Sequence, residues 1–295
     1  MIFDTHAHYD DEQFDNDREA LLASLFRLDE SAAGAGTTGP AEAAGRIGAG
    51  VTEAAGRIGA VVDVASTPES LSRVMTLAET YDKIYAAIGI HPDEVGSITD
   101  DVWQEIRDDL AKPKTVAVGE IGLDYYWDKE SHDLQEYWFR KQIELAHEFD
   151  KPINVHSRAA AEDTMRIIKD LYGEGGRGRR PDQPACPGII HCYAYSVEMA
   201  RDYVKMGFML GIGGVVTYKN GRKLKEVVEA IPLEHLVLET DCPYLSPEPH
   251  RGKRNSSLNL PYVVQTIAEL KGVTAEEVEK VTWENACRVY ALHDF

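Results

Sequence analysis

Two histidines separated by one residue, His6 and His8, directly follow a short apolar run at the start of the chain. Residues 2–5 have the composition of a β-strand, in which successive side chains point to opposite faces, so both imidazoles project from the same side. Two imidazoles that point the same way can bind one metal ion. Solvated strand ends show the same pattern, so the pair alone leaves both interpretations open.

Other side chains that bind metals well share one position, because nearly all of them lie at the C-terminal end of an apolar run. The set comprises His6, His8, His91, Glu120, His156, His191 and Asp241. Buried imidazoles and carboxylates that converge need a cation to compensate them, which favours metal binding over packing. The remaining histidines lie on or near helices, at a strand start, in a loop or at the C-terminus, where packing or solvation is the default: His132, His147, His235, His250 and His293.

The number of ligands suggests two ions rather than one. A catalytic ion needs only three or four protein ligands, and six are available: His6, His8, Glu120, His156, His191 and Asp241. A carboxylate can bridge two cations, and Glu120, on a middle strand, is the natural candidate. Two ions about 3.5 to 4 Å apart activate a shared water and stabilise the attacking and leaving oxygens. The pattern therefore predicts metal-assisted hydrolysis.

Eight short apolar runs must position these residues, and we predict that each is a β-strand: residues 1–6, 60–66, 84–90, 115–122, 152–157, 188–193, 208–214 and 235–241. Seven segments with helical periodicity separate the runs. Val- and Ile-rich strands without strict alternation are typical of a parallel sheet covered on both faces. This alternation predicts an α/β fold, the (β/α)8 TIM barrel, whose C-terminal rim carries the chemistry in barrel enzymes.

Two further helices, at 260–271 and 274–292, follow the eighth run, and the second begins with a capping box formed by Thr274 and Glu277. We predict a single domain over residues 1–295. Two loop insertions interrupt the pattern: an Ala/Gly-rich stretch at 29–60, which contains EAAGRIGA twice, and a Gly/Arg/Pro-rich loop at 173–184. Both lie between a helix and a strand, so we expect them on the face opposite the strand C-termini.

The composition excludes several classes of protein. The chain has 295 residues, of which 43% are hydrophobic, so it can bury a large core. Four cysteines without a C-x-x-C pair are too few for a disulfide-stapled secreted fold. The sequence has no signal peptide and no apolar run of about 18 residues, so we expect a cytoplasmic protein without membrane association. A net charge of −19 argues against a broad basic face for nucleic acid.

Seven ordered motifs resemble the TatD family of metal-dependent deoxyribonucleases, within the amidohydrolase superfamily: DTHAH, AAIGIHP, VGEIGLDYY, PINVHSR, IIHCY, LVLETDCPYLSP and HRGKRN. The resemblance implies that His6 and His8 bind the first ion and that His156 and His191 bind the second. It implies that Glu120 bridges the two.

The resemblance also implies catalytic roles for two carboxylates, Asp241 and Glu120. Asp241 would bind the first ion and take the proton from the attacking water. Glu239 lies two residues earlier on the same predicted strand and also faces the lumen. It either orients a ligand or a water, or is satisfied within the layers of the barrel.

Substrate contacts are predicted around the same rim. His91 resembles the family's GIHP histidine and is expected beside the scissile phosphate rather than on a metal. Arg251, with Lys253 and Arg254, lies in a loop after Asp241, where cations would hold a phosphodiester. Three further residues lie just past strand ends: Arg158, Tyr125 and Trp127. Tyr125 either contacts substrate or packs the loop, and Trp127 is placed where it would stack on a base.

These features lead to three hypotheses of function. The first is a two-metal phosphodiester hydrolase that cleaves DNA, with single-stranded ends as substrate. The second is an amidohydrolase-type enzyme for a small phosphoester, lactone or amide, which the acidic composition favours because a long DNA groove is usually basic. The third is a scaffold protein that has lost catalysis, but its signature would be a missing ligand, and none is missing. The ligand set accepts Mg²⁺, Mn²⁺ or Zn²⁺, so the ion's identity stays open.

Overall fold

The computed structural model describes residues 1–26, 57–127, 130–173 and 186–292. Its eight strands are β1 (Ile2–Ala7), β2 (Ile58–Val64), β3 (Ile84–Ala87), β4 (Thr115–Asp124), β5 (Ile153–Arg158), β6 (Gly188–Ile190), β7 (Met209–Ile212) and β8 (Leu236–Leu238). Each strand pairs in parallel with the next one along the chain. All residues of β1, β2 and β4 are buried, as expected for strands covered on both faces.

The first and last strands meet at the C-terminal rim and nearly close the sheet into a barrel. A parallel bridge joins Ala7 to Cys242. The amide of His8 donates to the carbonyl of Cys242 (2.8 Å), and the amide of Asp241 donates to the carbonyl of His6 (2.9 Å). The closure therefore brings the histidine pair at the end of β1 beside the aspartate that follows β8, although His8 and Asp241 are 233 positions apart in the sequence.

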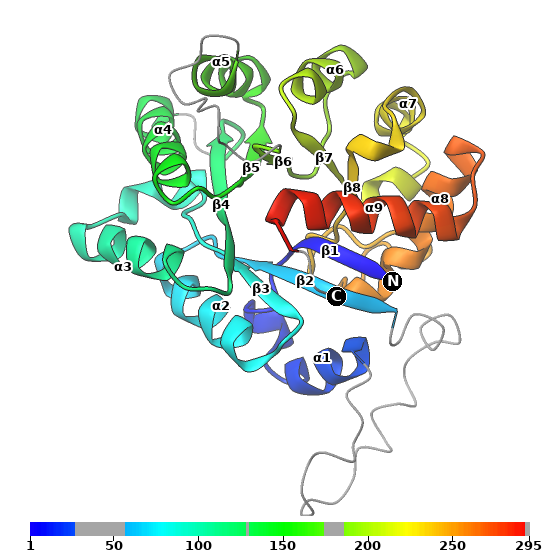
Figure 1. Ribbon diagram of the computed structural model, residues 1–295, viewed down its shortest axis with the longest axis horizontal. Helices are drawn as coiled ribbons and strands as arrows, with labels where there is room; N and C mark the ends of the chain where they lie inside the picture. The colour runs from blue at the N-terminus through cyan, green and yellow to red at the C-terminus, as the bar shows by residue number, and fades with distance from the viewer. Residues whose placement is uncertain (27–56, 128–129, 174–185, 293–295) are drawn as a thin grey trace, which may run out of the picture.

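Helices alternate with the strands and surround the sheet (Figure 1). They are α1 (Arg18–Phe26), α2 (Pro68–Thr80), α3 (Asp100–Leu110), α4 (His132–Glu148), α5 (Ala161–Tyr172), α6 (Val197–Lys205) and α7 (Arg222–Ala230). Local sequence fixes the start of α2, where Thr67 and Ser70 form a reciprocal capping box and Pro68 occupies the first turn. The predicted (β/α)8 TIM barrel is confirmed.

The two C-terminal helices, α8 (Leu260–Lys271) and α9 (Ala275–Tyr290), are also present as predicted. The side chain of Thr274 accepts a hydrogen bond from the amide of Glu277 (3.2 Å) and caps α9. Helix α9 lies against β1 and β8 (Figure 1). Its Val289 and Tyr290 join Phe3 in the hydrophobic cluster inside the barrel, at the N-terminal end of the strands. The end of the barrel opposite the C-terminal rim is thus filled by α9.

Several strands end earlier than the sequence predicts. The strands β3, β6, β7 and β8 end at Ala87, Ile190, Ile212 and Leu238, two to three residues before the ends of the predicted runs. The chain leaves the extended conformation at the rim, where Cys192 (φ 44°) and Asp241 (φ 56°) adopt left-handed backbone angles. Apolar periodicity carries no signal for such turns. Functional side chains such as His91, His191 and Asp241 consequently lie just after the strands.

The predicted insertions fall largely outside the described residues. Of the 29–60 insertion, residues 29–56 lie outside them, and the remainder belongs to the barrel because β2 begins at Ile58. Within β2, Ile58 pairs with Ile2 and is buried, so the second EAAGRIGA copy runs into the strand predicted to start at residue 60. The 173–184 loop lies outside the described residues except for Gly173. No helix in the described ranges is both long and apolar enough to cross a bilayer.

Candidate metal centre

The C-terminal rim brings together all six predicted metal ligands. His6 comes from β1, Glu120 from β4 and His156 from β5. His8 and His191 directly follow β1 and β6, and Asp241 lies three residues after the end of β8. Three groups of potential ligand atoms, each with all atoms within 4.8 Å of one another, include five of these residues: His6 with Glu120 and His191, His6 with His8 and Asp241, and His191 with Cys192 and Asp241. A fourth group holds the sixth, His156.

The carboxylate of Glu120 lies between two pairs of imidazoles. Its Oε2 is 3.4 Å from His6 Nε2 and 3.7 Å from His8 Nε2. Its Oε1 is 2.8 Å from His156 Nδ1 and 3.8 Å from His191 Nε2. Each carboxylate oxygen therefore faces one histidine pair, which is the arrangement that a bridging carboxylate requires.

Hydrogen bonds fix the orientation of two of these imidazoles. His8 Nδ1 donates to the carbonyl of Val64 (2.8 Å), and His191 Nδ1 donates to Glu239 Oε2 (3.1 Å). In each ring Nε2 then faces the centre, and it presents a lone pair there once its proton is lost. Histidine ligands usually donate their second ring N–H to a carbonyl or carboxylate in this way.

Glu239 is itself held in place. Its Oε1 accepts a hydrogen bond from the amide of Cys192 (2.6 Å). The carboxylate packs on Gly211 of β7, where a Cβ atom would lie 2.1 Å from Glu239 Oε2. Of the two interpretations of Glu239, these contacts describe the one in which the carboxylate orients a histidine of the centre.

His156 has a different environment from the one that the sequence predicts. Its Nδ1 contacts Glu120, and its Nε2 contacts Asp124 Oδ2 (3.0 Å), so carboxylates face both ring nitrogens. His91 lies edge-on to the same ring, with centroids 4.4 Å apart. The structure thus groups His156 with His91 and Asp124. His156 and His191 share Glu120 Oε1 as a neighbour.

Asp124 and Cys192 were missed as candidate site residues. Asp124 lies four residues after Glu120 on β4, and the period of two places both side chains on one face. That signal was present in the sequence, but the predicted strand stopped at residue 122. Cys192 lies near Asp241, and the backbone of Cys192 has a left-handed conformation. No pattern in the sequence predicts that conformation.

The charges of the cluster show what the site can bind. Burial lowers the pKa of His8, but the hydrogen bond and charge of Asp241 outweigh burial and raise it to about 10. Burial also lowers the pKa values of His156 and His191, but neighbouring carboxylates outweigh it and raise both to about 9. For His156 these carboxylates are chiefly Asp124 and Glu120. For His191 they are chiefly Glu239 and Asp241. The carboxylates therefore attract positive charge onto the imidazoles.

The carboxylates are correspondingly anionic. Burial raises the pKa of Glu120, but His6 and His156 outweigh burial and hold it well below its usual range. Burial also raises the pKa of Asp241, but the charge of His191 and the hydrogen bond from His8 outweigh burial and lower this pKa below its usual value. A ring of imidazole nitrogens and ionised carboxylates is the donor set that divalent transition ions prefer, so the residues present fit a metal.

Comparison with known proteins agrees with this site. The family model described as TatD related DNase matches residues 3–291. The chain belongs to the TatD family. It is 41% identical over 293 residues to the metal-dependent hydrolase YabD of Bacillus subtilis, covering 99% of this chain and all of the relative. It is 38% identical over 238 residues to the metal-dependent hydrolase TatD of Mycobacterium tuberculosis, covering 79% of this chain and 86% of the relative.

A solved structure has the same fold over nearly the full length of this TatD-family chain. The crystal structure of YjjV, a TatD homologue from Escherichia coli, superposes with a TM-score of 0.80 at 28% identity and covers 99% of this chain and 98% of that one. The resemblance read from the motifs is thus confirmed. This TatD-family chain is a metal-dependent hydrolase.

Two exposed arginines of this TatD-family chain border the rim. The Arg158 guanidinium lies over the rings of Tyr126 (4.2 Å) and Trp127 (5.3 Å). On the other side of the centre, the Arg251 guanidinium lies over the ring of Tyr218 (4.2 Å). Arg254 has a different role, because Asp17 neutralises it in a bidentate salt bridge with donor–acceptor distances of 2.6 and 2.8 Å.

The other predicted contacts are arranged as follows. His91 Nδ1 accepts a hydrogen bond from the amide of Asp93 (3.2 Å), so a neutral ring carries its proton on Nε2. Burial and His156 lower the pKa of His91 to about 4, which keeps the ring neutral. Tyr125 stacks on His132, with centroids 3.6 Å apart, and its hydroxyl faces Glu136. These contacts describe packing of the loop, one of the two alternatives for Tyr125.

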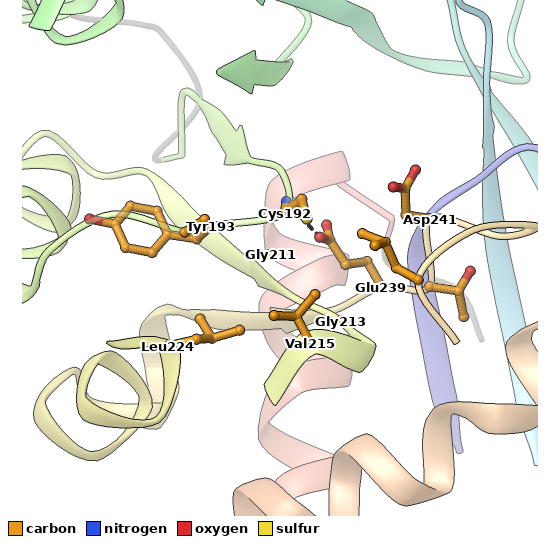
Figure 2. Close-up of a pocket in the computed structure, with 11 residues that line it drawn as sticks. Cys192, Tyr193, Gly211, Gly213, Val215, Leu224, Glu239 and Asp241 are labelled. Carbon is orange, nitrogen blue, oxygen red and sulfur yellow. Dashed lines mark hydrogen bonds between the residues drawn. The ribbon is translucent and has the colours of Figure 1, made fainter. Parts of the chain in front are cut away.

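A small pocket opens beside the centre (Figure 2). Its empty volume is about 310 Å³, part of which is open to solvent. Glu239, Asp241 and Cys192 border the pocket on the side of the centre, and Val215 and Leu224 supply an apolar wall. The pocket lies next to Asp241.

Proposed function

We propose that this chain is a two-metal phosphodiester hydrolase that cleaves DNA from single-stranded ends. The observation that carries the two-metal proposal is the position of Glu120, with one carboxylate oxygen toward His6 and His8 and the other toward His156 and His191. The family description, TatD related DNase, supports a phosphodiester of DNA as the bond that is cleaved.

The proposed centre divides the ligands into two sets that share Glu120. His6, His8 and Asp241 would hold one ion, and His156 and His191 would hold the other. Bound divalent ions supply an activated water at neutral pH and stabilise charge on the attacking and leaving oxygens. For His156 to bind, Nδ1 or Nε2 must give up its proton, because carboxylates now face both nitrogens.

Asp241 is the proposed proton acceptor. Its lowered pKa keeps the side chain a carboxylate at neutral pH, and its Oδ1 lies 3.4 Å from His8 Nε2 and 3.7 Å from His191 Nε2. Glu239 holds His191 in the orientation that presents Nε2 to the centre. In this proposal, a water between the two histidine pairs would pass its proton to Asp241.

Three residues around the centre would hold the phosphodiester. Arg251 and Arg158 carry charge that can pair with phosphate oxygens. His91 stays neutral and would act as an N–H donor from Nε2, since its Nδ1 already accepts a hydrogen bond. A neutral donor beside the phosphate provides orientation without adding a third positive charge.

One observation favours a second candidate, a small phosphoester, lactone or amide as substrate. The net charge of −19 leaves little basic surface for a long polyanion. The centre and its proton acceptor would be the same for either substrate, because one barrel rim supports many chemistries.

The test compares both substrate classes on one preparation. Protein stripped of metal is reloaded with Mg²⁺, Mn²⁺ or Zn²⁺ and incubated with end-labelled single-stranded DNA or with bis(p-nitrophenyl) phosphate. We expect metal-dependent shortening of the DNA that Asp241→Asn abolishes. Asp109→Asn serves as the matched control, because Asp109 is a buried carboxylate on α3 that pairs with Lys112. Cleavage of the small diester with intact DNA would refute the DNA assignment and leave the two-metal centre in place.

A further inference from the structure

Two large aromatic side chains lie exposed on the rim of the barrel. Trp127 is 67% exposed and Tyr126 is 52% exposed. Their rings meet edge to face, with centroids 4.8 Å apart. Exposed aromatic faces at a functional rim favour a planar ligand, because stacking removes the ring face from water.

The guanidinium of Arg158 completes this surface, since it lies over both rings. A stacked guanidinium keeps its N–H groups in its own plane, where they can donate to phosphate oxygens. The combination of exposed rings and a stacked cation matches a ligand that carries both a π-face and a negative charge.

Asp124 ties this surface rigidly to the metal centre. Its Oδ1 accepts hydrogen bonds from the amides of Tyr126 (2.9 Å) and Trp127 (3.1 Å), while its Oδ2 contacts His156 Nε2 (3.0 Å). The backbone of Arg158 is paired as well, because its carbonyl accepts a hydrogen bond from the amide of Tyr125 (2.9 Å). One carboxylate thus positions both the aromatic turn and an imidazole of the centre.

The opposite arginine offers no comparable surface. Arg251 covers the ring of Tyr218, which is only 8% exposed. An incoming planar group would therefore find an open ring face on the Arg158 side and a closed one on the Arg251 side.

We infer that Tyr126, Trp127 and Arg158 form a stacking platform for an unpaired base of a single-stranded polynucleotide whose phosphate enters the metal centre. The inference rests on the proposed function, because it names the surface that binds a base of the substrate proposed for the same site. Stacking on aromatic side chains is tolerant of sequence and contributes strongly to single-strand binding. It also fits the acidic chain, because stacking needs no broad basic surface. Paired bases hide their faces, so the platform selects single strands.

Binding and cleavage are measured separately to test the inference. Metal-loaded protein is titrated into a fluorescein-labelled phosphorothioate oligothymidylate, and anisotropy gives the dissociation constant. We expect Trp127→Ala to weaken binding about tenfold, in line with the loss of one stacked base, and Trp127→Phe to recover most of that loss. Tyr137→Ala is the matched control, because Tyr137 is 53% exposed but lies on α4, where its ring meets Trp138 edge to face. We expect this control to bind like the wild type.

Three outcomes would overturn the platform. In the first, the wild-type protein fails to bind the oligothymidylate. In the second, Trp127→Ala binds it as tightly as Tyr137→Ala does. In the third, blunt double-stranded DNA of the same length binds the protein as tightly as the single strand does. Failure of the proposed function is a different result. In that case the wild type binds the single strand and depends on Trp127, yet cleaves no unmodified DNA with any of the three ions.

Discussion

At the scale of single residues, the site is a cluster of imidazoles that carboxylates hold ready for a cation. His8 and His191 each donate from Nδ1, to Val64 and to Glu239, and present Nε2 to the centre. The raised pKa values of His8, His156 and His191 mean that protons occupy these nitrogens when no metal is bound. Protons and metal ions therefore compete for the same atoms.

This competition predicts opposite responses to pH in the metal-free and metal-loaded proteins. The folded-state pKa values of His8 (about 10), His156 (about 9) and His191 (about 9) lie above the ordinary value of 6.5. Their contribution to stability is thus complete below pH 6.5 and disappears as the pH rises through 9 to 10. Calorimetry should show a melting temperature that falls over this range without metal, whereas metal affinity rises. A constant melting temperature of the metal-free protein would contradict the assigned protonation states.

Most of the metal-ligating residues could be predicted from the sequence, because both the chemistry of His and Asp and their position after apolar runs can be seen in it. Ion pairs between residues far apart in the sequence could not be predicted. The pairing of Arg254 with Asp17 spans 237 residues, and it neutralises a cation that the loop sequence places among the phosphate contacts. Asp124 was legible in principle, since it continues the alternation from Glu120 on β4.

At the scale of elements, strand neighbours determine how the ligands are aimed. Runs of apolar residues in the sequence predict all eight strands, because both faces of a parallel barrel strand are covered. Their ends are not predictable from that pattern, since the left-handed turns at Cys192 and Asp241 depend on tertiary contacts. The turns matter for function, because they direct His191 and Asp241 into the centre after the strands have ended.

The packing of β7 against the residue that follows β8 predicts the effect of one small substitution. Gly211→Ala places a Cβ atom 2.1 Å from Glu239 Oε2, which is too close for both atoms, so the carboxylate must move away from His191 Nδ1. Loss of such a support usually costs about 10- to 100-fold in metal affinity. We expect titration calorimetry with Mn²⁺ to show a loss of that size. Gly96→Ala is the control, because no atom lies within 4 Å of its added Cβ, and equal affinities of the two variants would refute the role of Glu239.

At the scale of the whole molecule, the barrel has one end filled and one end equipped for chemistry. Helix α9 inserts Val289 and Tyr290 at the N-terminal end of the strands, and the ligands gather at the other. The acidic chain, with a net charge of −19, surrounds a rim where Arg158 and Arg251 are exposed. Substrate binding should therefore depend on a few local contacts rather than on a long-range field.

A weak dependence on salt follows from this distribution of charge. Each phosphate neutralised on a single strand contributes a slope of about −0.7 to the plot of log affinity against log salt concentration. Two arginines at the rim predict a total slope of roughly −1.4 for oligothymidylate. Anisotropy titrations at several salt concentrations measure the slope directly. A slope several times steeper would indicate an extended basic contact that this account does not contain.

The central claim is that Glu120 bridges two metal ions, and anomalous diffraction from crystals soaked in Mn²⁺ tests it most directly. We predict two anomalous peaks about 3.5 to 4 Å apart, one beside His6 and His8 and the other beside His156 and His191, with one oxygen of Glu120 toward each. A single peak, or a second peak held by His91 and Asp124 without contact to Glu120, would contradict the claim.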